Sequence, residues 1–126
     1  MFKRHKSKIL TSYSKVLAAL YFVGFILHVL DVFDLRLQFS SMSPLWKTWI
    51  LYLTFADFLV FLGLWFDTKW GEVGFLSVAL SQLVAYIFFQ NLFPDQWSLV
   101  VFHFITLVLY FAFKILIFDG KSFEKT

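Results

Sequence analysis

The stretch LWKTWILYLTFADFLVFLGLWF, residues 45–66, decides the fold. Apolar residues dominate it over about the ~20 positions that an α-helix needs to cross a bilayer core ~30 Å thick. One acidic residue, Asp57, interrupts it near the middle. Ser43 and Pro44 come directly before it, a pair typical of a helix N-cap followed by proline at the first helical position. The stretch therefore predicts a transmembrane helix.

Three further apolar segments have the same character. The predicted spans are residues 16–33, 45–66, 73–93 and 97–118. Short polar turns separate the last three spans, which predicts antiparallel neighbours. The five tryptophans lie at predicted span ends, as in an aromatic belt. We expect an all-α membrane protein, a four-helix transmembrane bundle with up-and-down topology and short loops, in which residues 1–126 form a single integral membrane domain.

Composition excludes other classes of protein. Of 126 residues, 60% are apolar and 15% are charged, and the mean hydropathy is +0.78. Soluble domains contain about 45–50% apolar and about 25% charged residues. An aromatic content of 23% excludes a disordered chain. The absence of cysteine removes disulfides, thiolate metal sites and cysteine nucleophiles.

Basic residues predict the orientation in the membrane, because Lys and Arg are retained on the cytoplasmic side. Arg36 and Lys47 fall on one side of the four predicted spans. The other nine basic residues fall on the opposite side, which places both termini in the cytoplasm; these are Lys3, Arg4, Lys6, Lys8, Lys15, Lys69, Lys114, Lys121 and Lys125.

Ionisable and amide groups inside the spans are the candidate functional residues, because each must face the protein interior or find a partner. Counting 1.5 Å per residue places Asp57, Gln82 and Tyr110 in one middle layer. Lys114 starts deeper and points toward the level of Asp57. An Asp57–Lys114 ion pair, or hydrogen bonds from Gln82 and Tyr110, would offset the desolvation of Asp57. The alternatives are a structural pin, a proton- or cation-binding carboxylate and a partner contact for Asp57, and snorkelling to the inner surface for Lys114.

Two histidines, His28 and His103, lie at similar depth nearer the outer side. Such a pair is able to ligate a metal or haem, and Asp31 lies three residues after His28. The alternative is two neutral histidines hydrogen-bonded across helices. We predict no catalytic residues, because the sequence has no catalytic constellation and no phosphate-binding loop. We predict no metal site and no cofactor, because two or three possible ligands without a recognised spacing are common by chance, and we assign no cofactor-binding residues. Small residues at 74, 77, 81 and 85 form a stripe that predicts close helix packing.

Several of these residues resemble a known pattern. Over about predicted spans two to four, the sequence resembles an uncharacterised four-helix membrane family of alphaproteobacteria, best represented in rhizobial-type species. The residues that carry the resemblance are Trp70-Gly71, Gln82, Tyr86, Phe93-Pro94, Phe102-His103, Tyr110 and Lys114, and Ser43-Pro44-Leu45-Trp46 fits it too. The position of Gln82 is usually acidic in that pattern. The resemblance implies a multi-pass protein of the bacterial inner membrane and implies no chemistry.

Three functions remain open. The first is a non-enzymatic accessory or scaffold subunit that binds a membrane-protein partner or a second copy of itself. The second is a small oligomeric transporter or channel that uses Asp57 as a proton- or cation-coupling carboxylate. The third is a haem- or quinone-associated redox subunit that uses His28 and His103. The lipid bilayer is a partner in each, and nucleic acid is not, since the sequence holds no soluble basic domain.

Overall fold

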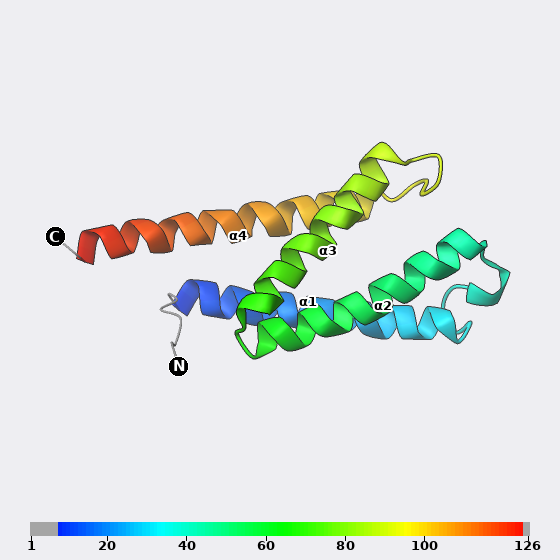
Figure 1. Ribbon diagram of the computed structural model, residues 1–126, viewed down its shortest axis with the longest axis horizontal. Coiled ribbons are helices and arrows are strands. Elements are labelled where there is room, and N and C mark those ends of the chain that lie inside the picture. Colours follow the sequence, from blue (N-terminus) through cyan, green and yellow to red (C-terminus); the bar gives the residue numbers. More distant parts are fainter. Residues whose placement is uncertain (1–7, 125–126) are drawn as a thin grey trace. The chain divides into compact units, whose positions relative to one another are not determined.

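Four long helices make up most of the chain (Figure 1). The computed structural model describes residues 8–124, with side chains over residues 9–115. The described residues contain no β-strand, and the predicted all-α class with four helices is confirmed. The elements are α1 (Lys8–Val32), the 3-10 helix η1 (Phe39–Ser41), α2 (Pro44–Trp65), α3 (Lys69–Phe88) and α4 (Trp97–Glu124).

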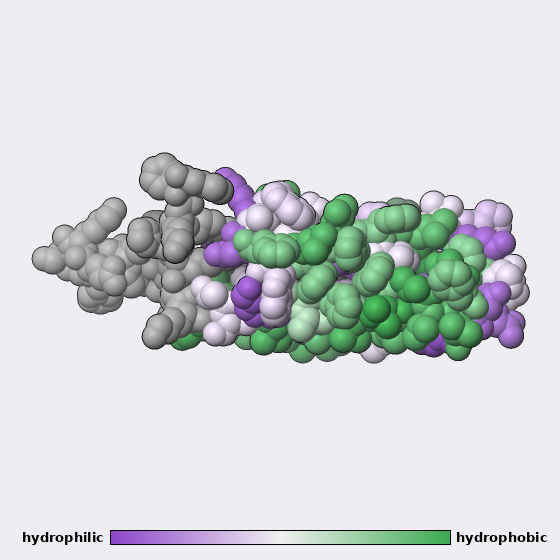
Figure 2. Space-filling model, turned by 90° about the horizontal axis from the view of Figure 1, so that it is seen from below, coloured by the Kyte–Doolittle hydropathy of each residue, from purple (hydrophilic) through white to green (hydrophobic). Residues whose placement is uncertain are grey.

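Each helix is long and apolar enough to cross a membrane. The candidate spans are Ile9–Val32, Pro44–Trp65, Lys69–Phe88 and Trp97–Ile115. Figure 2 shows apolar side chains gathered over the described face, with hydrophilic residues toward its ends. The chain is a multi-pass membrane protein of the four-helix-bundle type.

Four helix boundaries lie four or more residues from the predicted spans, and these are the starts of α1 and α3 and the ends of α3 and α4. Helix α1 begins at Lys8, because a helix continues through polar residues that an apolar count rejects. Helix α3 ends at Phe88 rather than residue 93. After the helix, the Leu92 and Phe93 amides both donate to the Phe89 carbonyl, at 3.0 and 2.9 Å, in a turn that ends before Pro94, which disfavours helical backbone in the residue that precedes it. The Phe93 ring packs edge-on against Tyr86, with ring centroids 5.9 Å apart. Residues 89–93, which the predicted span included, therefore form an apolar turn after the helix.

The chain groups into two compact units. One comprises residues 1–14 and 79–126, and the other comprises residues 15–78. We call them the terminal unit and the central unit. Lys3, Arg4, Lys6 and Lys125, which enter the predicted orientation, lie outside the described residues, as do the side chains of Lys8 and Lys121.

In the central unit, α1 and α2 run antiparallel. The Phe22 ring lies 4.8 Å from that of Phe61, and the Phe25 ring lies 5.0 Å from that of Phe58. The residue number rises from Phe22 to Phe25 on α1 while it falls from Phe61 to Phe58 on α2, as antiparallel packing requires. Helix α2 begins as predicted, with the Ser43 side chain accepting a hydrogen bond from the Trp46 amide.

Helices α2 and α3 form an antiparallel hairpin with backbone-to-backbone contact. A Cβ atom at Gly63 or Gly71 would collide with the backbone of the other glycine. One turn farther on, Gly74 faces the Val60 side chain. The α3 residues that are buried are Gly71, Glu72, Phe75, Val78, Ala79, Gln82, Ala85 and Tyr86.

The predicted small-residue stripe on α3 is therefore only partly a packing surface. Ala85 is buried, but Gly74 and Ser81 are half-buried and Ser77 is exposed. The buried face is displaced by about one position along the helix from the predicted stripe, to Phe75, Val78, Gln82 and Tyr86.

In the terminal unit, the start of α1 packs against α4. The Tyr13 hydroxyl donates a hydrogen bond of 2.6 Å to the Thr106 carbonyl. Its ring lies edge-on to Phe113, with centroids 5.1 Å apart. Tyr13 thus joins a helix near the N-terminus to one near the C-terminus.

Candidate functional site

The carboxylate of Asp57 lies against the backbone of α1 at a glycine. Asp57 is 5% exposed and belongs to α2. A Cβ atom added at Gly24 of α1 would lie 2.8 Å from Asp57 Oδ2, so only glycine leaves room for the carboxylate. The other oxygen, Asp57 Oδ1, is buried and accepts no hydrogen bond within the described part of the chain.

One imidazole lies between two carboxylates. His28 Nε2 is 3.6 Å from Asp57 Oδ2, and His28 Nδ1 is 3.5 Å from Asp31 Oδ2. Gly24, His28 and Asp31 are three or four residues apart, so they share one face of α1. The predicted proximity of His28 and Asp31 is therefore present, and Asp57 joins them from α2.

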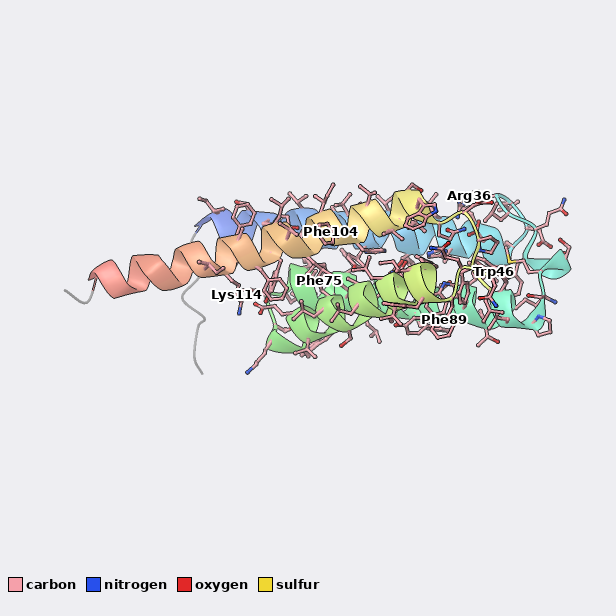
Figure 3. All side chains as sticks on the ribbon, turned by 90° about the horizontal axis from the view of Figure 1, so that it is seen from above. Arg36, Trp46, Phe75, Phe89, Phe104 and Lys114 are labelled. Atoms are coloured by element: carbon pink, nitrogen blue, oxygen red, sulfur yellow. The ribbon has the colours of Figure 1, made fainter. Side chains whose placement is uncertain are left out.

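Asp31 is held in turn by the loop that follows α1. Its side chain is fully buried, at 0% exposure, and Oδ2 accepts a hydrogen bond of 2.7 Å from Arg36 Nη2. Oδ1 accepts a second hydrogen bond, of 3.2 Å, from the Leu37 amide. Arg36 lies in this loop with its side chain 40% exposed (Figure 3). The ion pair neutralises a buried charge and fixes the loop onto the end of α1.

We call Asp57, His28, Asp31 and Arg36 the polar array. It runs from an exposed guanidinium through a buried carboxylate and an imidazole to a second buried carboxylate. Imidazole donates and accepts protons near neutral pH, so the array has the groups for acid–base chemistry. The Asp31–Arg36 ion pair has no net charge. The Asp57–His28 pair consists of one acid and one base.

The other predicted site residues belong to the terminal unit. Tyr86 donates a hydrogen bond of 3.4 Å to Gln82 Oε1, one turn away on α3. Lys114 Nζ lies 5.7 Å from the centroid of the Tyr110 ring, within the range of a cation–π interaction. The interactions proposed between Asp57 and Gln82, Tyr110 or Lys114 join different units and stay predictions.

His103 is buried on α4, at 4% exposure. Its carbonyl accepts a hydrogen bond of 2.9 Å from the Thr106 hydroxyl, and its ring lies edge-on to Phe102. His28 and His103 belong to different units, so a joint role for them stays a prediction. Over the described residues, no group of three or more His, Cys, Asp or Glu is arranged to hold a metal ion.

Sequence reasoning missed Arg36 as a member of the site. It used Arg36 only to set orientation, although an arginine five residues after an acid near a helix end was an available signal. It also placed His28 far from the level of Asp57, because it assumed that neighbouring helices end at the same depth. His28 is four residues from the end of α1, whereas Asp57 is thirteen residues into α2. The contacts of Gly24 with Asp57 and of Phe25 with Phe58 place the start of α2 roughly five to seven residues, or ~8–10 Å, past the end of α1.

Comparison with known proteins identifies a family and no characterised relative. A family model described as "Family of unknown function (DUF6163)" matches residues 8–121. No curated protein and no solved structure matches the chain. The match agrees with the resemblance to an uncharacterised family.

Proposed function

We propose that this chain, which belongs to the family of unknown function DUF6163, is a non-enzymatic accessory subunit of a membrane assembly in the alphaproteobacterial inner membrane. It acts by helix–helix association with another membrane protein. The observation that carries this proposal is the exposure of Ser77 in an apolar span.

Lipid explains an exposed apolar side chain but gives no reason for an exposed small polar one. Ser77 lies on α3 between Gly74 and Ser81, which are only half-buried. Small residues let a second helix approach closely, and serine hydroxyls hydrogen-bond across helix pairs in membranes. The exposed face of α3 around Ser77 therefore suits a partner helix.

The test is affinity purification of the full chain, tagged and expressed at its native level, in mild detergent. Ser77→Phe fills the small-residue face, and Val108→Phe, at an exposed position on α4, is the matched control. We expect a stoichiometric membrane-protein partner to co-purify with the wild type and with Val108→Phe, and to be lost with Ser77→Phe. Recovery of a monomer from all three proteins would contradict the proposal.

We further propose that both termini are cytoplasmic. The arrangement in the central unit supports this orientation. Lys15 Nζ donates a hydrogen bond to the carbonyl of Trp65 and lies 4.2 Å from the centroid of its ring, and Lys69 begins α3 at the same end. Arg36 and Lys47 lie at the opposite end. A reporter fused after Thr126 is expected to be cytoplasmic, and a periplasmic signal would reverse the assignment.

A second candidate function is proton- or cation-coupled transport through an oligomer, with Asp57 as the coupling carboxylate. The position of His28 beside Asp57 favours it, since an imidazole is a suitable proton partner for a buried acid. Proton flux into liposomes that contain the wild type, and its loss in Asp57→Asn, would support this function. Equal flux in both would contradict it.

The redox role of His28 and His103 stays a prediction. A visible absorption spectrum of the purified protein tests it, and a preparation that neither contains nor takes up haem would remove the haem version.

A further inference from the structure

Around His28, the polar array contains two carboxylate acceptors but only one imidazole N–H to donate to them. His28 is the only side chain between Asp31 and Asp57 in the central unit, with one ring nitrogen toward each carboxylate. A neutral imidazole carries a single N–H, so it donates to one carboxylate and presents a lone pair to the other. Whichever tautomer forms, one of the two nitrogen–oxygen pairs consists of two acceptors. One additional proton would turn both pairs into donor–acceptor contacts.

The surroundings of the two carboxylates decide which pair takes the additional proton. Asp31 already has a cation, because Oδ2 accepts from Arg36, and the Leu37 amide donates to Oδ1. Asp57 has no such partners in the described residues, and its Oδ1 accepts no hydrogen bond. His28 Nδ1 lies 3.5 Å from Asp31 Oδ2 and makes no hydrogen bond in the described residues. Asp57 is therefore the carboxylate with unused acceptor capacity, and the additional proton is bound on the side of the imidazole where Nε2 faces it.

We propose that His28 Nε2, on a side chain that is 18% exposed, and Asp57 Oδ2 form a binding site for one proton, with Asp31 and Arg36 as positioning residues. A proton taken from the aqueous phase is bound between the two atoms. It adds an N–H bond when it lies on His28 and an O–H bond when it lies on Asp57, and no other bond breaks. The charge of the pair rises by one unit, from that of a carboxylate and a neutral imidazole to net zero.

Gly24 supplies the space for this site. The Asp57 carboxylate lies where a side chain at residue 24 would otherwise lie, which brings Oδ2 within 3.6 Å of the imidazole. That separation exceeds an N–H···O hydrogen bond of ~2.7–3.2 Å, so proton binding would draw α1 and α2 together by a few tenths of an ångström.

Other charged groups of the central unit lie away from the pair. On α3, Lys69 and Glu72 are near the level of the Gly63–Gly71 contact, at least six residues along α2 from Asp57, or ~9 Å. Lys15 lies at the same end, beside Trp65. On α2, Lys47 lies ten residues before Asp57. Among the side chains that the structure describes, the terminal unit also contains the titratable residues Tyr13, Tyr86, Asp95, His103, Tyr110 and Lys114.

This inference deepens the second candidate function, and it rests on that candidate only for the biological use of the proton. An accessory subunit with the same site would bind the proton without transporting it. The experiment therefore measures proton binding by the isolated chain and does not depend on flux or on a partner.

The test uses the full chain in lipid nanodiscs across a pH series. Infrared difference spectroscopy detects the C=O stretch of a protonated carboxyl group, and NMR of ¹⁵N-labelled histidine reports the His28 ring. In the wild type we expect one buried carboxyl band and the His28 signal to change at the same pH, as coupled sites do. Asp57→Asn should remove that band and move the His28 midpoint by about one pH unit or more, which is tenfold in proton affinity.

His28→Gln keeps the carboxyl group and keeps the proposal testable if Asp57→Asn fails to fold. It should move the midpoint of the carboxyl band by a similar amount. His103→Gln, a buried histidine of the terminal unit, and Asp34→Asn, an exposed acid, are the controls. The proposal is overturned if Asp57→Asn leaves the His28 midpoint unchanged, if His28→Gln leaves the midpoint of the carboxyl band unchanged, or if His103→Gln moves either midpoint equally.

Discussion

The two faces of α2 make contacts of opposite kinds. Toward α3, Gly63 and Gly71 bring the two backbones together, with the Trp70 ring beside Gly63. Toward α1, a glycine again permits close approach, but here Gly24 admits the carboxylate of Asp57 rather than a helix backbone. The first contact depends on shape alone, and the second depends on shape and charge.

This difference separates a structural contact from a candidate site. The α2–α3 contact is closed by the turn at residues 66–68, where Asp67 adopts a left-handed backbone with φ 56° and the Thr68 amide donates to Gly63. The α1–α2 contact is closed by the longer loop at residues 33–43, which brings Arg36 to the polar array. A function that requires charge therefore belongs on the α1 side of α2.

The largest effect is expected at the backbone contact. Gly71→Ala places a methyl group against the backbone of Gly63, which cannot rotate away as a side chain would. Overpacking in cores costs ~1–3 kcal/mol, and we expect a loss of stability at or above the upper end of that range. The free energy of unfolding in mixed micelles of mild detergent and dodecyl sulfate measures it.

Gly74→Ala is the matched control for that measurement. A Cβ atom at Gly74 would meet only the Val60 side chain, at 3.4 Å. Since alanine is also the better helix former, this variant should be close to neutral or slightly more stable. Similar losses in the two variants would contradict the distinction between a backbone and a side-chain contact.

The next largest effect is expected at the outer end of the polar array. Arg36→Gln leaves the fully buried Asp31 without its cation. Breaking a buried ion pair costs ~3–5 kcal/mol, and we expect about 2 kcal/mol because the Arg36 side chain is 40% exposed. Asp31→Asn in the same chain should restore most of the loss, since it removes the uncompensated charge. A double variant no more stable than Arg36→Gln would show that the ion pair is not the cause.

The sequence was sufficient to predict the four helices and the N-cap of α2, because length, hydropathy and the Ser43-Pro44 pair are local signals. It also placed His28 and Asp57 on interior faces. It could not pair them, because periodicity fixes the face of a residue and says nothing of how far one helix slides along another. For the same reason Gly63 was not singled out, and Gly71 entered only as part of the Trp70-Gly71 motif. Each glycine is unremarkable until its partner is known to lie opposite.

A smaller effect is expected at the glycine beside Asp57. Gly24→Ala puts a Cβ atom 2.8 Å from the present position of Oδ2 and displaces a short side chain rather than a backbone. We expect a loss of about 1 kcal/mol, below that of Gly71→Ala. The variant should also separate the pH midpoints of the His28 and Asp57 signals. The combination of Gly24→Ala with Asp57→Asn tests the mechanism, because a displaced neutral side chain should cost less than a displaced carboxylate.

The smallest effect is expected at Asp34, in the loop that joins α1 to α2. Its carboxylate accepts a hydrogen bond of 2.9 Å from the Ser40 amide, and this bond holds the pKa of Asp34 below its ordinary value of 3.8. A carboxyl group with a lowered pKa in the folded protein adds stability above the ordinary pKa, and that contribution is lost as the pH falls through the lowered value. The stability difference between wild type and Asp34→Asn should thus be present at neutral pH and vanish in strong acid. Because Asp34 is fully exposed, the difference should be smaller than that of any variant above. A difference that persists unchanged at acid pH would mean that the amide hydrogen bond, not the charge, orders this loop.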